Sequence, residues 1–575
     1  MSWARVLARR PERSIVFSNV DERFLPPPEH RAALTFGHPM LHYAWSRAVL
    51  NAGEELLDRT IDRVGADQVA YVDVNGDAPE EWTYGRLRGE VDRLAHGLRV
   101  LGIQPGERVL TRFSDRPQAA VVQLALWKVG AIVVPSATVE AAREVAYMAN
   151  DTESVAIICE TDSAVEVEKA LSDCSTVRAV VGWPDMIGTF QHSLGSLSAG
   201  QPETFEAHPT EPLDASGIYY TGGTTGRPKG CLHTHAAELA VADLNNAARG
   251  VTADSVLFTH APVGHAFGNG ERINFPLRAG ARAILKTRPA PAEVWQLLST
   301  WSVTTMAAAA TMYRMLLQTV EDPRAAYPEL PLETALSSGE ILDHVTFDKW
   351  QRLLGFPVRN AVGMTPMRHL FLDSMWGGEK VAPGLSVGSP LPGYEARLID
   401  AAGTIVTDPE MAGRLAMRGP TGITYWCNNN DTLLARAAQD VEAGWSLLDD
   451  AYLRDGDGWL WFHGRLDDMI VTGGRQVAPV EVEGVLADHP AVAEVAVVPA
   501  PDLTRGFVVA AFIRVAPGHE AGDALETELQ TFTKERMAGY KYPRQIHFVD
   551  ELPKDGVGKV QRRRLREQLA VDAVS

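Results

Sequence analysis

The stretch Tyr219-Tyr220-Thr221-Gly222-Gly223-Thr224-Thr225-Gly226-Arg227-Pro228-Lys229-Gly230 is the most informative part of this 575-residue sequence. An apolar strand is expected over 217–220, and a helix is expected to begin near Thr234. Between them, glycines let backbone N–H groups approach an anion, hydroxyl groups donate hydrogen bonds, and Lys229 supplies a positive charge. The stretch therefore predicts a phosphate-binding loop, although it does not fit the G-x-x-x-x-G-K-[ST] pattern of P-loop proteins. Taken alone, it is also compatible with a flexible glycine turn or a surface lid that binds nothing.

The sequence on either side of this loop alternates short apolar strands with helices. In the helix expected over 83–101, Leu87, Val91 and Leu94 are spaced by four and three residues, and Thr83 can cap the start. Alternation of this kind predicts β-α units in a mostly parallel sheet. Further strands are expected over 108–113, 131–135, 155–159 and 177–181, and further helices over 46–65, 117–129, 139–149 and 163–172.

The pattern changes twice toward the C-terminus. From 381 to 464 short strands are separated by frequent turns, and after about 466 the pattern is compact α+β. We therefore expect an α/β protein with a large N-terminal body of mostly parallel β-α layers plus a short-stranded β subdomain, residues 1–464, and a small C-terminal α+β domain, residues 468–575. In this domain, helices are expected over 479–487 and 522–537, and strands over 492–499 and 507–515.

Composition narrows the class of protein. Hydrophobic residues make up 45% and charged residues 22% of the chain, which is typical of a globular protein. The formal charge of -19 disfavours nucleic acid and anionic membranes as partners. The sequence has no apolar run long enough to span a membrane and no apolar stretch of a secretory signal at its start, so we expect a cytoplasmic protein. The four cysteines are widely spaced and indicate neither a zinc site nor a disulfide framework.

Two other segments place small residues after an expected strand. Ser337-Ser338-Gly339-Glu340 follows a strand expected over 333–336, and the segment 362–365 follows one expected over 357–360. Ligands bind at such strand ends in open α/β sheets. Ordinary turns have the same appearance in a sequence, so each segment alone is a weak signal.

Two further segments carry charge. Asp450 and Arg465 could hold ribose hydroxyls, since a carboxylate accepts and a guanidinium donates, or they could form a solvated ion pair. Lys559 lies in the glycine-rich stretch 553–562. This stretch could carry a cation into the cleft of another domain, or it could be a solvated basic loop.

Together, in this order and spacing from about residue 45 to 570, these segments resemble the adenylate-forming superfamily of acyl- and aryl-CoA ligases, luciferases and peptide-synthetase adenylation domains. Within it, the chain is most similar to benzoate- and 2-aminobenzoate-CoA ligases. The stretch Phe267-Gly268-Asn269-Gly270 with Phe275-Pro276-Leu277 is similar to their FG-x-G-to-FPL stretch. Residues 363–371, GMTPMRHLF, are similar to their GSTEMLH-type segment.

The resemblance implies a two-step reaction that uses ATP, Mg²⁺ and CoA. A carboxylate attacks the α-phosphorus of ATP to give an acyl-adenylate and pyrophosphate, and the thiol of CoA then displaces AMP. By this resemblance Lys229, Thr365 and Lys559 are catalytic, Lys559 bridging the carboxylate and the α-phosphate. The residues implied to bind ATP are Thr221, Gly222, Gly223, Thr224, Thr225, Gly226, Lys229, Ser338, Gly339, Glu340, Asn360, Val362, Gly363, Met364, Thr365, Asp450, Arg465 and Lys559.

The acyl pocket implied by the resemblance suits an aromatic acid. The small run 307–310 leaves room, and Phe267 offers a ring face against which an aromatic substrate can pack. His265 could donate to a carboxylate or could be a structural histidine. The full set expected to contact the substrate is His265, Phe267, Gly268, Ala309, Gly339, Gly363 and Met364.

The resemblance also implies movement between the two domains. Residues 465–467 form the expected hinge, with Asp467 at its pivot, about which the C-terminal domain rotates after adenylation. Gly473 and Gly474 are then expected to border the tunnel for the thiol, where any side chain would block access.

One position departs from the family. A glutamate that ligates magnesium normally follows the threonine of the 363–366 segment, and here that position is Pro366, which has no ligand atom. Water and phosphate oxygens could complete the metal shell, another carboxylate could replace the glutamate, or the ATP step could be impaired. The protein ligand of magnesium is therefore left unassigned.

The sequence thus predicts an enzyme that activates an aromatic acid. An ortho-substituted benzoate is favoured, with salicylate and 2-aminobenzoate as the first candidates. We expect the enzyme to be a monomer or a homodimer. Two alternatives stay open: adenylation alone with a separate acyltransferase, and a non-catalytic protein that binds acyl-adenylate. The stretch 384–388 fits the G-x-S-x-G elbow of α/β-hydrolases, but the prolines around it prevent the helix that the elbow needs.

Overall fold

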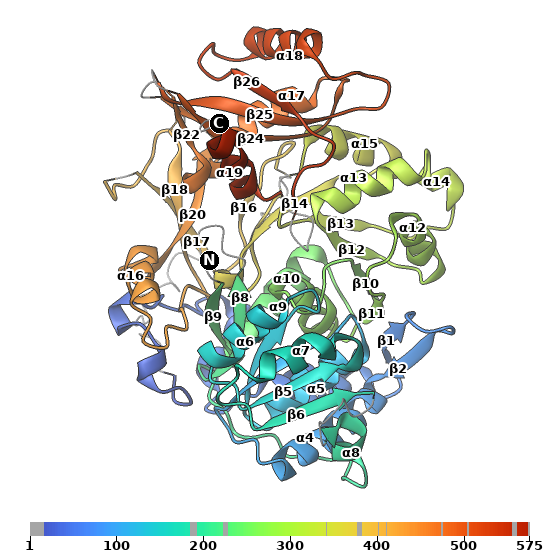
Figure 1. The fold of residues 1–575 in the computed structure, drawn as a ribbon. Coiled ribbons are helices and arrows are strands. Elements are labelled where there is room, and N and C mark those ends of the chain that lie inside the picture. Colours follow the sequence, from blue (N-terminus) through green and yellow to red (C-terminus); the bar gives the residue numbers. More distant parts are fainter. Residues whose placement is uncertain are drawn as a thin grey trace, which may run out of the picture.

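The computed structural model contains two sheets that form the N-terminal body, a third sheet beside them and a fourth sheet in the C-terminal domain (Figure 1). This arrangement confirms the expected α/β fold with a large body and a smaller C-terminal domain. The structure describes residues 17–184, 192–221, 228–340, 342–375, 382–400, 402–409, 411–472, 475–502, 505–554 and 560–572.

The first sheet has the strand order β16-β15-β14-β13-β12-β10-β11-β1-β2. Its strands from β14 to β1 are parallel, while β15, β16 and β2 run antiparallel to their neighbours. The strands are β1 Val69–Asp73, β2 Glu80–Thr83, β10 Val256–Thr259, β11 Arg282–Leu285, β12 Thr305–Ala308, β13 Thr334–Ser337, β14 Val358–Gly363, β15 Leu370–Asp373 and β16 Ser389–Pro390.

The second sheet has the order β7-β6-β5-β3-β4-β8-β9, and it is parallel except for the antiparallel pair β8–β9. The expected strands near 108, 131, 155 and 177 are β3 to β6 of this sheet. Its strands are β3 Arg108–Arg112, β4 Ile132–Ser136, β5 Ala156–Glu160, β6 Ala179–Trp183, β7 His192–Ser193, β8 Ala215–Thr221 and β9 Lys229–Thr234.

The third and fourth sheets contain the strands toward the C-terminus, of which the three longest have 10 or 11 residues. The third is antiparallel, and the fourth is antiparallel except for the parallel pair β25–β26. The third contains β17 Glu395–Ile399, β18 Gly413–Arg418, β19 Val441–Glu442, β20 Trp445–Arg454 and β21 Leu460–Arg465. The fourth contains β22 Ile470–Thr472, β23 Arg475–Val477, β24 Val492–Asp502, β25 Gly506–Val515 and β26 Gln545–Phe548.

The helices cover the faces of the sheets. Among the described helices, none combines the length and the apolar character that crossing a membrane requires. They are α1 Tyr43–Ser46, α2 Ala52–Leu56, α3 Asp58–Val64, α4 Tyr84–Val100, α5 Pro117–Lys128, α6 Ala142–Asp151, α7 Ala164–Leu171, α8 Leu194–Ser198, α9 His235–Arg249, α10 Ala266–Asn269, α11 Phe275–Ala279, α12 Pro291–Thr300, α13 Ala310–Thr319, α14 Pro323–Ala326, α15 His344–Leu354, α16 Asp431–Asp440, α17 Pro479–Ala487, α18 Asp523–Arg536 and α19 Arg562–Asp572.

Local signals explain where the first helices begin and end. The helix expected over 83–101 is α4, whose Thr83 side chain accepts a hydrogen bond from the backbone of Arg86. The single helix expected over 46–65 is wrong, since α2 begins only at Ala52 and α3 follows it. The side chain of Asn51 accepts from Gly53 and Glu54 and thereby caps the start of α2.

The C-terminal domain has apolar cores of its own on both faces of the fourth sheet. Val482 of α17 and Leu529 of α18 are buried on one face, and Leu565 and Leu569 of α19 are buried on the other. Figure 1 shows α18 above this sheet and α19 below it, toward the body. A domain that buries both faces of its own sheet can keep its fold while it changes position relative to the body.

Candidate active site

The predicted phosphate loop connects two antiparallel strands. Thr221 ends β8 and Lys229 begins β9, and the two residues are directly paired. The sequence predicted that the helix would follow the loop, but β9 intervenes, and α9 begins at His235 after Thr234 caps it. Lys229 is half-buried, with its Nζ 5.4 Å from the ring centroid of Tyr425. The loop residues Gly222, Gly223, Thr224, Thr225 and Gly226 lie outside the described part of the chain.

The ends of three neighbouring parallel strands bring the other expected nucleotide segments together. Ala308 of β12 is paired with Ser337 of β13, and Ser337 is paired with Asn360 of β14. Because these strands are parallel, their carboxyl ends lie at one edge of the sheet. Ala309 follows β12, and the segment Ser338, Gly339 and Glu340 follows β13. Asn360, Val362 and Gly363 belong to β14, which ends three residues later than expected.

Hydrogen bonds hold this edge in place. Oε2 of Glu340 accepts from the backbone N of Thr311 at 2.9 Å and from its Oγ1 at 2.7 Å, at the start of α13. Gly339 has φ +85°, a left-handed conformation that favours glycine. Nδ2 of Asn360 donates to the carbonyl of Leu385 at 2.8 Å. The backbone around Ser338 and Gly339 is therefore fixed by contacts on both sides.

The turn after β14 contacts the strand that begins with Lys229. Thr365 opens the short 3-10 helix η7, Thr365–Met367, and its carbonyl accepts from Nε2 of His233 at 2.8 Å and from the backbone N of Arg368 at 2.9 Å. Burial, together with the nearby Arg368 guanidinium, lowers the pKa of His233 to about 3. The ring is therefore neutral and donates through Nε2. This contact places Thr365 and the phosphate-loop hairpin side by side.

Three of the expected acyl-pocket residues, His265, Phe267 and Gly268, lie at or in α10. His265 directly precedes this helix, Phe267 and Met364 are half-buried, and the carbonyl of Phe267 accepts from Nε2 of His369 at 3.1 Å. The centroids of the Phe267 and His369 rings are 5.4 Å apart. Gly268 is buried so closely against the chain that an added Cβ would lie 2.1 Å from the carbonyl oxygen of Pro262. Gly268 thus allows α10 to pack closely against the loop before it.

Asp450 and Arg465 lie opposite each other on β20 and β21. Nε of Arg465 is 3.8 Å from Oδ1 of Asp450, whose side chain is buried.

The structure around Ser386 excludes the hydrolase alternative. Ser386 is fully buried and its Oγ donates to the carbonyl of Leu460 at 2.8 Å, so it is a structural serine.

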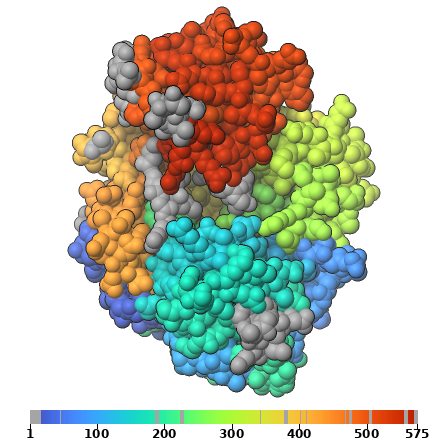
Figure 2. All heavy atoms as spheres, viewed as in Figure 1, coloured from blue at the N-terminus to red at the C-terminus, as the bar shows by residue number. Residues whose placement is uncertain are grey.

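The C-terminal domain lies over this end of the body. Figure 2 shows it in red, with a hollow beneath it between the domain and the body. Among the described residues, histidine–carboxylate contacts cross the boundary: His344 contacts Asp488, and Nδ1 of His463 lies 3.5 Å from Oε1 of Glu481. Asp467 lies in the 3-10 helix η8, Leu466–Asp468, between the third and fourth sheets. Its side chain is outside the described part of the chain, as are Gly473, Gly474 and Lys559.

These features match one protein family over most of the chain. Residues 57–426 match the AMP-binding enzymes, and residues 481–559 match the AMP-binding enzyme C-terminal domain. The chain belongs to the AMP-binding enzyme family. Its resemblance to adenylate-forming ligases is confirmed.

Several proteins similar to this AMP-binding enzyme are ligases of aromatic acids. The benzoate–CoA ligase of Thauera aromatica is 34% identical over 520 residues, which cover 90% of this chain and 95% of that protein. The 3-hydroxybenzoate–CoA ligase of Aromatoleum sp. (strain CIB) is 32% identical, with 90% and 97% covered. The solved structure of the anthranilate CoA ligase AuaEII with anthranoyl-AMP is similar with a TM-score of 0.84 and 29% identity, covering 92% of this chain and 99% of that one. The protein is an AMP-forming aryl-acid ligase, with ATP, Mg²⁺ and CoA as cofactors.

The described residues offer few side-chain ligands for a magnesium ion. Among them, no group of three or more His, Cys, Asp or Glu side chains is placed to hold a metal. The turn at η7 offers the Thr365 hydroxyl, while Pro366 offers no ligand atom. Magnesium usually keeps several waters and binds substrate phosphates, so such a sparse protein shell suits it.

The sequence did not indicate one prominent feature beside the site. Arg368, fully buried next to η7, forms an ion pair with the fully buried Glu238 of α9. The sequence contained one hint of this pair: Arg368 occupies the position at which the GSTEMLH-type segment has leucine. Its partner, 130 residues away in sequence, could not be identified from the sequence.

Proposed function

We propose that this enzyme converts an ortho-substituted benzoate, with salicylate and 2-aminobenzoate as the first candidates, to an aryl-adenylate and then to an aryl-CoA. The observation that carries the proposal is that Phe267 packs against His369, which belongs to the same segment as Met364 and Thr365. The similarity to aryl-CoA ligases and to the anthranilate ligase structure supports an aromatic substrate.

In the first step, one carboxylate oxygen of the acid attacks the α-phosphorus, and the bond to pyrophosphate breaks. Both reactants are anions, so positive charge and hydrogen-bond donors must offset their repulsion. We assign this role to Lys229 with the loop from Thr221 to Gly226, and to Lys559. Magnesium bound to the phosphates supplies further positive charge at the transition state.

The remaining expected site residues have positioning roles in this proposal. Asp450 and Arg465 hold the ribose, and the strand ends from Ser338 to Glu340 and from Asn360 to Thr365 hold adenine and separate it from the acid. The pocket for the ring comprises His265, Phe267, Gly268, Ala309, Gly339, Gly363 and Met364.

In the second step, the CoA sulfur attacks the carbonyl carbon of the aryl-adenylate, AMP leaves, and the thiol proton passes to solvent. We assign the reorientation of the C-terminal domain to the hinge 465–467 around Asp467. The tunnel for the thiol arm is assigned to Gly473 and Gly474. Because a thiol with a pKa near 8.5 is mostly protonated at pH 7, its placement against the carbonyl controls this step.

A panel of acids tests the proposal directly. Pyrophosphate release is measured with benzoate, salicylate, 2-aminobenzoate, 3-hydroxybenzoate and acetate, each with and without CoA, and thioester formation is followed by mass spectrometry. We expect the highest kcat/KM with one of the two ortho-substituted acids and little turnover of acetate. A higher kcat/KM for benzoate or 3-hydroxybenzoate would contradict the ortho preference.

The arms with and without CoA test whether the second step occurs on this protein. Pyrophosphate release without any thioester would indicate an adenylating enzyme that needs a separate acyltransferase.

A further inference from the structure

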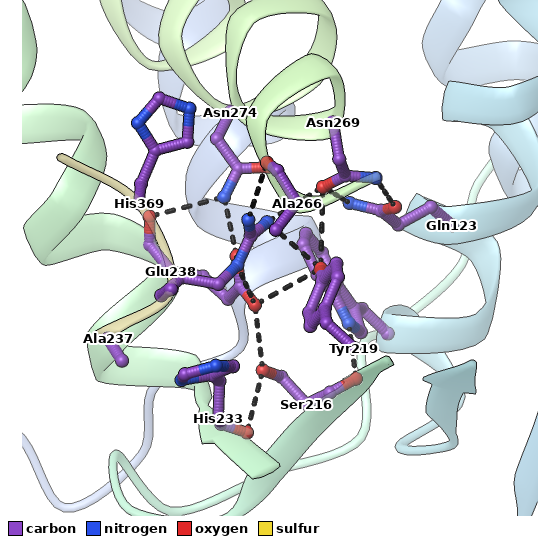
Figure 3. Close-up of polar contacts among 12 residues, drawn as sticks. Gln123, Ser216, Tyr219, His233, Ala237, Glu238, Ala266, Asn269, Asn274 and His369 are labelled. Carbon is purple, nitrogen blue, oxygen red and sulfur yellow. Dashed lines mark hydrogen bonds and ion pairs between the residues drawn. The ribbon is translucent and has the colours of Figure 1, made fainter. Parts of the chain in front are cut away.

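A fully buried ion pair lies beneath the candidate active site. Nε of Arg368 donates to both carboxylate oxygens of Glu238, at 2.9 and 2.8 Å, and neither side chain is exposed. Glu238 also accepts from Nδ2 of Asn274 at 2.6 Å and from the hydroxyl of Tyr219 at 3.3 Å. Figure 3 shows Glu238 among Asn274, Tyr219 and Ser216. Removing two charges from water is costly, so a buried pair of this kind is weak support for stability.

The guanidinium of Arg368 also connects the three segments expected to hold the substrates. Nη1 donates to the carbonyl of Ala266, which precedes Phe267, at 3.1 Å. Nη2 donates to the hydroxyl of Tyr219 in β8 at 2.9 Å and to Oδ1 of Asn269 at 2.7 Å. Arg368 itself directly follows η7. One side chain therefore joins the turn at Thr365, the aryl-pocket helix α10 and the strand that leads into the phosphate loop.

The backbone at Arg368 is strained as well. Its φ is +66° with ψ −49°, a conformation that residues other than glycine rarely adopt. Strained residues persist only where the surrounding contacts hold them, and they cluster at active sites. Here the guanidinium contacts and the hydrogen bond from the Arg368 backbone N to the carbonyl of Thr365 hold the conformation. Burial of a charge and backbone strain, both unfavourable, coincide at one residue.

We propose that Arg368, braced by Glu238, is a positioning residue that sets the aryl-pocket helix and the phosphate-loop strand against the Thr365 turn, so that the carboxylate meets the α-phosphorus in line. The inference rests on the proposed placement of ATP and the aryl acid. Each substrate binds mainly on its own segment, while the distance between their reacting atoms depends on how the segments are joined. A displacement of about 1 Å between reacting groups can cost roughly a hundredfold in rate.

The test compares three variants with the wild-type enzyme. The double variant Arg368→Leu/Glu238→Leu removes both charges, because a single change would leave the other charge buried without its partner. Arg368→Lys keeps the positive charge but cannot reach all the acceptors that the planar guanidinium joins. The matched control is Arg249→Leu/Glu271→Leu, which removes a second buried Arg–Glu pair, bonded at 3.0 and 2.9 Å, that lies outside the proposed machinery.

We measure thermal unfolding, the kcat of pyrophosphate release, and KM for ATP and for the best aryl acid of the panel. For Arg368→Leu/Glu238→Leu we expect a folded protein whose kcat is lower by about 30- to 100-fold, with both KM values within about threefold of wild type. Arg368→Lys should have an intermediate kcat. The control should keep a kcat near that of wild type. A double variant that retains the wild-type kcat, or that loses no more than the control, would show that the pair has only a structural role.

Amide hydrogen exchange gives a readout that does not depend on turnover. Peptides that cover 363–370 and 262–270 should exchange faster in Arg368→Leu/Glu238→Leu than in wild type. In the control, the peptide that covers 363–370 should exchange at the wild-type rate. Unchanged exchange in the double variant would overturn the inference, even if its activity were low. If the wild-type enzyme releases no pyrophosphate with any acid, the proposed function fails, and the exchange measurement still decides whether Arg368 joins these segments.

Discussion

Replacement of Pro366 by glutamate tests how the enzyme holds magnesium. Pro366 lies in the first turn of η7, where a backbone N–H has no partner within the helix, so restoring this N–H breaks no hydrogen bond. The turn is also held from outside, because the carbonyl of Thr365 accepts from His233 and from the backbone of Arg368. The structure therefore accommodates Pro366→Glu with its backbone in place.

The size of the effect follows from the contact that the carboxylate would restore. A charge-assisted contact contributes about 1.5–3 kcal/mol, or roughly tenfold to a hundredfold in affinity. Position 366 is half-buried, so solvent screening favours the lower end of this range. We expect Pro366→Glu to lower the Mg²⁺ concentration for half-maximal pyrophosphate release by about tenfold at saturating ATP.

The control for this experiment is Pro366→Ala, which restores the N–H and frees φ without adding a ligand atom. Its half-maximal Mg²⁺ concentration should equal that of the wild-type enzyme. If the glutamate and alanine variants shift together, backbone freedom and not the carboxylate is responsible. If neither shifts, another group already supplies the ligand, and the interpretation of a sparse protein shell is wrong.

Three further predictions concern the C-terminal domain and pH. Lys559→Ala should slow adenylation by about 10²- to 10³-fold, with a much smaller effect on thioester formation from supplied aryl-AMP; equal losses in both assays would contradict its assignment. Asp467→Pro should retain pyrophosphate release and lose CoA transfer, and full thioester turnover would place the hinge elsewhere. Burial lowers the pKa of His233 and of His235 to about 3, so each stays neutral when folded but takes up a proton on unfolding below pH 6.5. Stability should therefore fall by about 2 kcal/mol per histidine from pH 6.5 to 5, measured by urea denaturation, and His235→Gln should reduce this slope.

Local sequence signals predicted those elements whose boundaries depend on nearby residues. The helices α4 and α17 were expected within one residue of their observed ends, because their apolar spacing and terminal residues agree. The strand β9 was missed because the stretch from Lys229 to Thr234 is short and leads directly into a helix signal. Its partner β8 stabilises it through a hairpin, and a hairpin around a long glycine-rich loop has no distinctive turn sequence.

The candidate site was predictable to the extent that fold class determines it. Once parallel β-α units are expected, residues such as Gly339 and Asn360 at successive strand ends must lie at one edge of the sheet. Contacts between distant segments were not predictable in this way. The hydrogen bond from His233 to the carbonyl of Thr365 joins residues 132 positions apart in the sequence. No local sequence pattern predicts to which carbonyl a buried histidine will donate.

Two of the departures from the family segment, Pro366 and Arg368, act on the same turn. Proline restricts the backbone at 366, and the buried guanidinium of Arg368 holds an unfavourable backbone conformation two residues later. In the family, a glutamate at the first of these positions ties the turn to magnesium. In this chain the turn is tied instead to Glu238, Tyr219 and Ala266 by the protein's own contacts. Its geometry is consequently a property of the folded chain before ATP and magnesium arrive, so Arg368→Leu/Glu238→Leu should impair positioning even at saturating magnesium.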